Sequence, residues 1–451
     1  MPKAIFDKLA GALPKNLKVA SRDLSPTVTE TVVTGLLGVK LLKMTTSVVD
    51  GQKGKEITCT VEGKLKGRIQ PMVDRFLAVI NRLKVIGTAD GKLVHNLYNP
   101  PMPSPAATRP FERKLRSLAL GYVLPATATL SVTPACPCKC IHCSADRFIT
   151  KQARPLTTEE LAGVVDQALD LGVCTLIFTG GEPMARPDLY DQIARADKTR
   201  CHVMIFTCGA FLNEENVRRL KDAGLGSMNV SIDSDRPEEH DEFRRRPGTF
   251  QQAIDGAKLA RRLGIMVGVS TYATHENITS GRLEHLVQIA RDEGFHEITI
   301  FDCVPTGKFL RRPELILGRK DIMKVRELAD RFNADAAAFG VTAQAKANAP
   351  DGGGCFGAFS QFYMTCYGDI DPCDFNPVTF GNVREKPLAE IWKTMVSHPE
   401  FSKHAMSCRM QSMRYRRLYI DPLAEEETLP VSIARLPGDG TILAKNQVAA
   451  K

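Results

Sequence analysis

The stretch that decides the fold and the chemistry reads Cys136-Pro137-Cys138-Lys139-Cys140-Ile141-His142-Cys143. A β-branched run over 127–133 comes directly before it and predicts a strand that leads into this loop. Within the loop, Cys136, Cys140 and Cys143 form a C-x3-C-x2-C triplet. Three thiolates leave one iron of a [4Fe–4S] cube without a protein ligand, whereas an electron-transfer ferredoxin closes its cube with a fourth cysteine. The triplet therefore predicts a cluster that is open to a small molecule.

The composition is that of a globular protein. A chain of 451 residues is too long for one ordinary core, so we expect about two or three domains. No stretch reaches about 18 uninterrupted apolar residues, so we expect no membrane span. Residues 1–6 lack the apolar core and cleavage site of a secretion signal, which argues against export. The formal net charge of +9, spread over the whole chain, favours a solvated basic surface, and we expect no nucleic-acid partner.

Cysteine usage points to metal rather than to disulfides. In a long chain without a secretion signal, clustered cysteines among a total of 13 are more often metal ligands. Because an exposed iron–sulfur cluster is readily oxidised, we expect a reducing compartment, the cytoplasm. Some cysteines show no ligand spacing and are expected to pack in the interior: Cys59, Cys174, Cys201 and Cys303.

Residues 1–110 are expected to form an N-terminal accessory region and linker. The segment 74–84 predicts an amphipathic helix with Phe76, Ile80 and Leu83 on one face. Basic residues beside apolar stretches would suit peripheral membrane contact through residues 1–95, but a small domain packed on the rest of the chain is favoured. The proline-rich run 99–105 predicts an extended linker.

Residues 111–340 alternate between strand and helix patterns. The alternation predicts a parallel sheet with right-handed crossovers, either doubly wound or curled into a partial barrel. In both arrangements ligands bind at the carboxyl ends of the strands, where the cysteine loop falls. The expected strands are 127–133, 173–179, 202–207, 227–232, 265–271 and 297–303, and the expected helices are 158–171, 213–223, 249–263, 281–293 and 319–333.

Over roughly residues 127–382 the chain resembles the radical S-adenosylmethionine (radical SAM) enzymes. The resemblance implies a partial (β/α)6 barrel in which Cys136, Cys140 and Cys143 hold a [4Fe–4S] cluster. The open iron then binds the amino and carboxylate groups of S-adenosylmethionine (SAM). Cys138 is not part of the family triplet. His142 matches a position that is usually aromatic and packs near the adenine.

Three further segments match the family. Gly180, Gly181, Glu182 and Pro183 resemble the GGEP segment that binds the methionine amine, and glycines there allow close approach of the backbone. Further matches imply contacts with the methionine carboxylate and ribose from Ser231, Asp233 and Arg244, and an adenine turn at Pro305 and Gly307. One departure is Cys208, where related enzymes often have asparagine; it is either a structural cysteine or a substrate-facing thiol.

Residues 341–420 resemble the SPASM/twitch extension, which holds auxiliary iron–sulfur clusters, and 421–451 are expected to be a tail. Cys355 and Cys373, with Gly368 between them, fit its C-x(9–15)-G-x4-C opening. The later cysteine-rich part is reduced to Cys408, so we expect no second auxiliary cluster. Cys355, Cys366, Cys373 and Cys408 would suffice for one [4Fe–4S] cluster. Alternatively, Cys366 and Cys408 are bystanders and the site is open.

The resemblance implies an enzyme that reductively cleaves SAM to a 5′-deoxyadenosyl radical, which abstracts a hydrogen atom from a substrate. An electron donor such as flavodoxin or ferredoxin is implied. The SPASM/twitch resemblance favours modification of a peptide or protein. An alternative is a lipid or other small molecule at a membrane surface. A non-catalytic iron–sulfur electron carrier is disfavoured by the open triplet and the GGEP segment.

Overall fold

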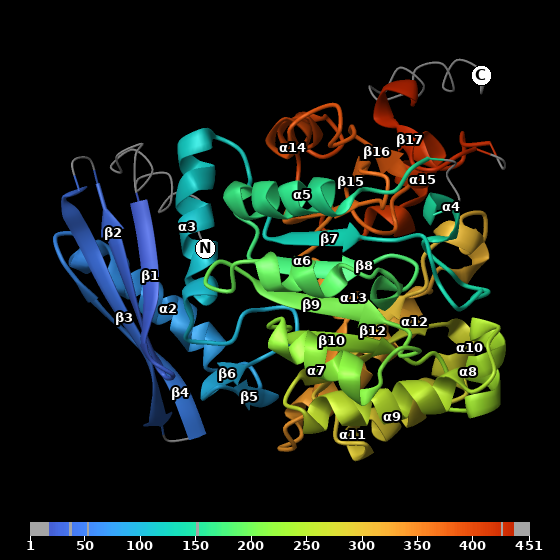
Figure 1. Ribbon diagram of the computed structural model, residues 1–451, viewed down its shortest axis with the longest axis horizontal. Coiled ribbons are helices and arrows are strands. Elements are labelled where there is room, and N and C mark those ends of the chain that lie inside the picture. Colours follow the sequence, from blue (N-terminus) through green and yellow to red (C-terminus); the bar gives the residue numbers. More distant parts are fainter. Residues whose placement is uncertain (1–17, 36–37, 52–53, 150–152, 425–426, 437–451) are drawn as a thin grey trace.

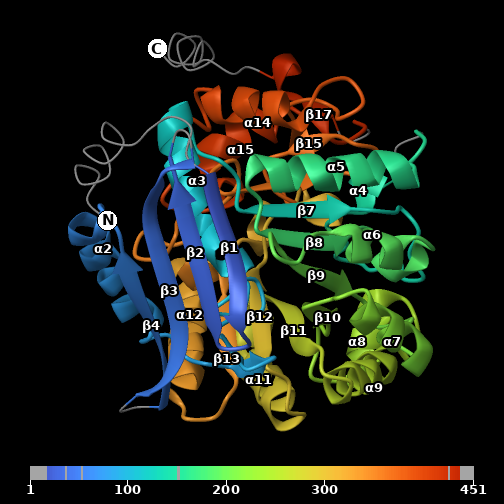
Figure 2. The same cartoon turned by 60° about the vertical axis from the view of Figure 1, so that its left-hand side comes forward.

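The computed structural model describes residues 18–35, 38–51, 54–149, 153–424 and 427–436. An antiparallel sheet lies at one side of the molecule and a larger, mostly parallel sheet with its helices makes up the rest (Figure 1). Helix α3 (Pro105–Leu120) lies between the two sheets (Figure 2). Its Arg109 and Arg116 donate hydrogen bonds to the carbonyls of Leu169 and Asp170, so this helix ties the N-terminal part to the core.

The N-terminal sheet runs in the order β1 (Lys18–Ser25), β2 (Val28–Thr34), β3 (Lys40–Gly51) and β4 (Gly54–Glu62), and α2 (Lys66–Ile80) packs on it. The helix differs from the one expected over 74–84. It begins earlier and buries Ile69 and Leu77 against the sheet. Of the predicted apolar face only Ile80 packs; Phe76 is exposed because the buried stripe runs through Ile69 and Leu77, and Leu83 is exposed beyond the end of the helix.

The larger sheet contains the six predicted parallel strands: β7 (Thr127–Ser131), β8 (Thr175–Thr179), β9 (His202–Thr207), β10 (Ser227–Ser231), β11 (Met266–Ala273) and β12 (Glu297–Asp302). Beyond them, β13 (Gly340–Ala343) adds in parallel to β12, and β14 (Gln361–Met364) adds in parallel to β7. A short strand, β15 (Ile370–Asp371), completes this edge. The predicted partial barrel is confirmed.

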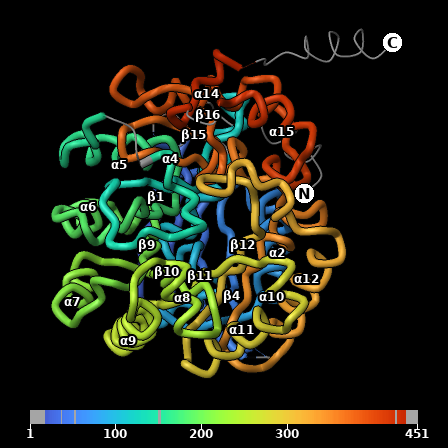
Figure 3. The backbone as a smooth tube through the Cα atoms, turned by 90° about the vertical axis from the view of Figure 1, so that its right-hand side faces the viewer, coloured from blue at the N-terminus to red at the C-terminus, as the bar shows by residue number. Residues whose placement is uncertain are grey.

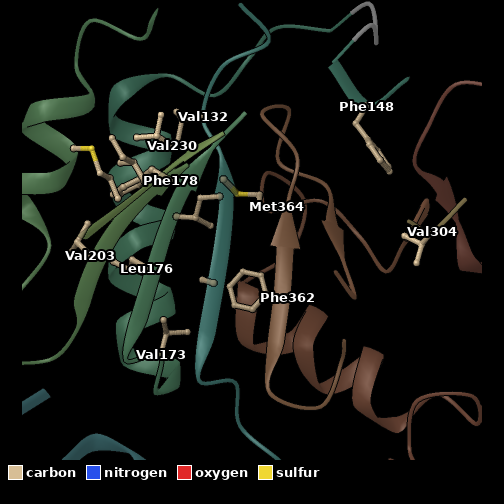
Figure 4. Close-up of a cluster of buried hydrophobic side chains, with 14 of the residues drawn as sticks. Val132, Phe148, Val173, Leu176, Phe178, Val203, Val230, Val304, Phe362 and Met364 are labelled. Carbon is tan, nitrogen blue, oxygen red and sulfur yellow. The ribbon is translucent and has the colours of Figure 1, made fainter. Parts of the chain in front are cut away.

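Helices lie outside the curved sheet, as Figure 3 shows from the side of the strands' carboxyl ends. They are α5 (Thr158–Leu171), α6 (Leu189–Arg195), α7 (Glu214–Asp222), α9 (Thr249–Arg262), α11 (Arg282–Asp292) and α12 (Arg319–Ala334). The capping box predicted at the start of α5 is formed by Thr157 and Glu160. The face of the sheet that these helices cover is apolar, whereas other strand positions, such as Thr175, Asn229 and Glu297, are polar and buried. Figure 4 shows Leu176 and Phe178 of β8 and Phe362 and Met364 of β14 on either side of β7.

The floor of the barrel is closed by the chain before α3. The backbone N–H of Leu97 donates to Glu297, and the Leu97 carbonyl lies 3.0 Å from His202 Nε2 and accepts from Ser227 Oγ. These three partners are the first residues of β12, β9 and β10. The floor therefore lies at the amino ends of the strands, opposite the cysteine loop. No helix among the described residues combines the length and apolar character that crossing a bilayer requires.

Candidate active site

The cysteine loop leaves β7 and is fixed from two sides. The backbone N–H groups of Lys139 and Ile141 donate to the carbonyls of Arg244 (3.1 Å) and Phe243 (2.9 Å). On the other side, Lys308 Nζ donates to the Cys140 carbonyl at 2.8 Å. The loop therefore keeps its place at the carboxyl ends of the strands through contacts made after β10 and β12, far away in the sequence.

The thiols of the loop lie close together. Cys138, Cys140 and Cys208 form one buried cluster with Cys143 against it, and Cys136 is exposed. A hydrogen bond with Cys138, helped by the positive charge of Arg244, lowers the pKa of Cys140 to about 6 although burial opposes this. A thiol that ionises at neutral pH is suited to binding iron. Three thiols on one loop, two of which (Cys136 and Cys140) have a lowered pKa, fit an open [4Fe–4S] cluster.

Glu182 follows β8 and is fully buried. Its carboxylate accepts from Thr207 Oγ1 (2.8 Å), from the backbone N–H of Cys208 (2.7 Å) and from that of Met184 (3.2 Å). Burial raises its pKa. No arginine or lysine within the described ranges forms an ion pair with Glu182. A buried carboxylate without a cation is suited to a ligand ammonium group.

The two glycines before Glu182 allow the end of β8 to pass against the cysteine loop. The N–H groups of Gly181 and Glu182 donate to the carbonyls of Thr133 and Ala135, both at 2.8 Å. A Cβ at Gly181 would lie 2.4 Å from the Ala135 oxygen. Gly180 has a φ of +146°, which L side chains rarely adopt. Pro183 then opens a 3-10 turn, Pro183–Ala185.

A buried ion pair lies beside the loop. Arg244 Nε donates to Asp233 Oδ2 at 2.7 Å, and His142 Nε2 lies 3.4 Å from Asp233 Oδ1. Burial would raise the pKa of Asp233, but Arg244 and His142 hold it well below its usual range. His142 also stacks on Tyr272, with ring centroids 4.7 Å apart. The Arg244–Asp233 ion pair and the stacked rings of His142 and Tyr272 therefore place charged groups and aromatic rings beside the thiols.

The remaining predicted residues lie at the same rim. Ser231 ends β10, and its hydroxyl lies 3.3 Å from that of Ser270. Pro305 is buried, and Gly307 has a φ of +51°, so a Cβ there would lie 2.1 Å from the Cys143 oxygen. The turn after β12 thus touches the cysteine loop. The structure therefore brings together every residue predicted for the cluster and for SAM.

Several contributors were missed from the sequence. Thr207 and the Cys208 backbone hold Glu182, Tyr272 stacks on His142, and Lys308 binds the loop. Thr207 and Tyr272 lie at or near the carboxyl ends of β9 and β11. The general rule that such ends carry the site could have found both.

The C-terminal cysteines divide into two places. Cys355, Cys373 and Cys408 line one small pocket. Cys366 does not line it: its carbonyl accepts from Leu156 N–H at 2.8 Å, and its thiol interacts with Tyr367 and Ser131. The predicted four-cysteine set is therefore assembled only in part. Within the described segments no group of His, Cys, Asp or Glu converges on a single metal ion. A [4Fe–4S] cluster does not require one, because each cysteine binds a different iron of the cube.

Comparison with known proteins decides the family. Residues 130–292 match the Radical SAM superfamily model, and residues 355–413 match the SPASM model, an iron–sulfur cluster-binding domain. The chain is a radical SAM enzyme. As such, it uses SAM and a [4Fe–4S] cluster, and its SPASM region implies an auxiliary iron–sulfur cluster.

Similar proteins include two kinds of radical SAM enzyme. The AdoMet-dependent heme synthase of Methanosarcina barkeri is 26% identical over 289 residues, covering 58% of this chain and 80% of that protein. The PqqA peptide cyclase of Gluconobacter oxydans is 28% identical over 279 residues, covering 59% and 76%. The crystal structure of Streptococcus suis SuiB bound to its precursor peptide SuiA has the same fold, with a TM-score of 0.51, 14% identity and coverage of 86% and 89%.

Proposed function

We propose that this radical SAM enzyme modifies a peptide or protein. The observation that carries the proposal is the similarity to the PqqA peptide cyclases over 59% of the chain. The fold shared with SuiB, whose structure holds a precursor peptide, agrees with it. The heme synthases, similar over a comparable length, keep a small-molecule substrate as the competing class.

In this proposal Cys136, Cys140 and Cys143 hold the cluster, and the carboxylate of Glu182 pairs with the methionine ammonium of SAM, which gives the buried anion its missing cation. Arg244 is fixed by Asp233 and pairs with the methionine carboxylate. The remaining SAM contacts are assigned to Gly180, Gly181, Pro183, Ser231, Asp233, His142, Pro305 and Gly307. When bound, the cluster and SAM supply a 5′-deoxyadenosyl radical that takes a hydrogen atom from the substrate.

An acidic electron carrier such as a flavodoxin or ferredoxin is the proposed electron donor. The exposed Cys136 marks the edge of the loop that is open to solvent. Lys139 and Arg245 are exposed beside it. Lys308 adds a third cation, which Asp146 offsets in part at 3.6 Å. This positive rim favours an acidic partner at the cluster edge.

A second candidate is a lipid or other small molecule modified at a membrane surface. One observation favours it. Phe76 and Val79 on α2 and Leu83 just after its end are 48%, 58% and 46% exposed. We call these three residues the exposed α2 face. Arg75 and Arg82 are exposed next to it, and apolar side chains flanked by cations suit an anionic bilayer.

The deciding experiment is anaerobic reconstitution with iron, sulfide, SAM and dithionite. We expect 5′-deoxyadenosine, and we expect replacement of Cys136, Cys140 and Cys143 by alanine to abolish it while Cys138→Ala retains it. Absence of 5′-deoxyadenosine from protein with intact clusters would refute the assigned chemistry. Co-expression with short peptides encoded beside the gene, followed by mass spectrometry, tests the substrate class. A mass change in one peptide is expected, and turnover of an extracted lipid with no peptide change would favour the second candidate.

A further inference from the structure

The turn that follows β12 is pressed against the cysteine loop. A Cβ at Gly307 would lie 2.1 Å from the Cys143 oxygen, so a side chain does not fit there. The next residue, Lys308, bonds to the loop twice. Its backbone N–H donates to the Cys143 carbonyl at 3.1 Å, and its Nζ donates to the Cys140 carbonyl at 2.8 Å. Lys308 therefore contacts the backbone of two of the three cysteines assigned to the cluster.

The positive charge of Lys308 is only partly balanced. Its ion-pair partner is Asp146, whose Oδ1 lies 3.6 Å from Nζ, and the two side chains are 33% and 36% exposed. Asp146 begins the short helix α4 (Asp146–Ile149), just after the loop. A partly exposed pair at this distance contributes little, because water competes for both charges. Much of the charge of Lys308 therefore still acts on the loop to which its ammonium group is bonded.

Two other cations beside the loop act differently. Arg244 donates to the buried Asp233 at 2.7 Å, so these two opposite charges largely cancel. Lys139 belongs to the loop, but it is exposed, and its backbone N–H is the group that bonds to the Arg244 carbonyl. Water and salt screen an exposed charge. Lys308 differs from both because its ammonium group itself bonds to the loop.

A cation at this place favours the reduced form of an iron–sulfur cluster. A [4Fe–4S] cube with three thiolates is a net anion, and reduction by the donor adds one electron and no proton. The net charge of a cluster is one of the factors that set its reduction potential, and a nearby cation stabilises the more negative state. Near a protein surface, where the effective dielectric constant is about 20, one such charge shifts the equilibrium about tenfold.

We propose that Lys308 raises the reduction potential of the SAM-binding cluster by holding its ammonium group against the cysteine loop. This role is separate from the docking of an electron donor, because it concerns the equilibrium of the cluster and not the rate of encounter. It is also independent of the substrate class, because a potential is measured without substrate. A higher potential allows a weaker donor to reduce the cluster.

The test is a redox titration of the reconstituted full-length protein with soluble mediators, followed by EPR. The signal of the SAM-binding cluster is the one that changes when SAM is added and that is absent when Cys136, Cys140 and Cys143 are alanine. Lys308→Met should lower the potential of this signal by about 59 mV, which corresponds to a tenfold shift of a one-electron equilibrium. Lys308→Arg keeps the charge and should retain most of the potential. Asp146→Asn removes the offsetting carboxylate and should raise it.

Lys139→Met, the same substitution at an exposed lysine of the loop, is the matched control and should lower the potential clearly less. If Lys308 only supports the loop, Lys308→Met will hold less iron but the remaining cluster will keep its potential, and this result would overturn the proposal. An equal fall in Lys308→Met and Lys308→Arg, or in Lys308→Met and Lys139→Met, would overturn it too. If Lys308→Met does not fold, the change at the partly exposed Asp146 decides: a raised potential supports the proposal and an unaltered one overturns it.

Discussion

The carboxylate of Glu182, just after β8, accepts a hydrogen bond of 2.7 Å from the backbone N–H of Cys208, the first residue after β9. With Thr207 Oγ1 as a second donor, the ends of two neighbouring strands hold one buried anion in place. The bond uses the backbone of Cys208, so it does not require asparagine at this position. The departure from the usual family residue thus leaves the support of Glu182 unaffected.

Glu182→Gln should weaken SAM binding by about tenfold to a hundredfold. The neutral amide keeps the size of the side chain but removes the charge that pairs with the ligand ammonium, and a charged hydrogen bond contributes about 1.5–3 kcal/mol. The measurement is the Kd of SAM for reconstituted protein of verified iron content. Glu215→Gln, an exposed change on α7, is the control. Equal affinity in the two variants would remove Glu182 from the SAM site.

Gly181→Ala should lower the amount of cluster that the protein holds. The new Cβ would meet the Ala135 oxygen at 2.4 Å, and this oxygen belongs to the backbone that leads into Cys136. The cysteine loop must therefore shift. Gly163→Ala, in α5 with open space around its Cβ, is the control and should stabilise the fold by about 0.5–1 kcal/mol. Iron content and visible absorption after reconstitution measure the effect, and equal iron in both variants would contradict the expected shift.

Much of this site could be predicted from the sequence because its signals are local. The triplet, the segment 180–183 and the strand ends each occupy a few neighbouring residues, and the alternation of elements places them at one rim. The bond from the Cys208 backbone to Glu182 and the stacking of Tyr272 on His142 depend on how strands pair, which no short motif encodes. For the same reason, spacing alone grouped Cys366 with the auxiliary cysteines, whereas pairing of β14 with β7 holds it elsewhere.

Glu297 should make the stability of the protein fall as pH rises. It is fully buried at the barrel floor, and burial raises its pKa to about 7 from an ordinary 4.5. Between these values the folded state binds more protons than the unfolded state, so the free energy of unfolding decreases with rising pH, by up to about 3 kcal/mol. Glu297→Gln keeps an acceptor for the Leu97 N–H but cannot ionise. Its melting temperature should therefore exceed that of the unmodified protein by more at pH 8 than at pH 5. Glu284→Gln, a change at an exposed position, is the control and should leave the pH dependence of the melting temperature as it is. If Glu297→Gln also left this pH dependence unaltered, Glu297 would not be its cause.

The exposed α2 face should bind anionic vesicles if the second candidate substrate class is correct. Replacing Phe76, Val79 and Leu83 together by serine removes the apolar contact and should abolish sedimentation with phosphatidylserine-containing vesicles, with little loss of stability because these side chains are exposed. Serine at Met323 and Met413, exposed elsewhere, is the matched control. Equal sedimentation of both variants, or none for the unmodified chain, would count against membrane contact through α2.

Lys139→Glu should slow electron delivery by a protein donor and leave chemical reduction unchanged. Lys139 is exposed between Cys138 and Cys140, and its backbone is tied to Arg244, so the substitution reverses charge at the rim without touching a thiol. The rate with a reduced flavodoxin should drop several-fold at low salt and less at high salt, because opposite charges steer association. The rate with dithionite should stay the same, which separates docking from damage to the cluster. Lys324→Glu on α12 is the control, and a variant that slows both reductants equally would show that Lys139 supports the loop rather than a partner.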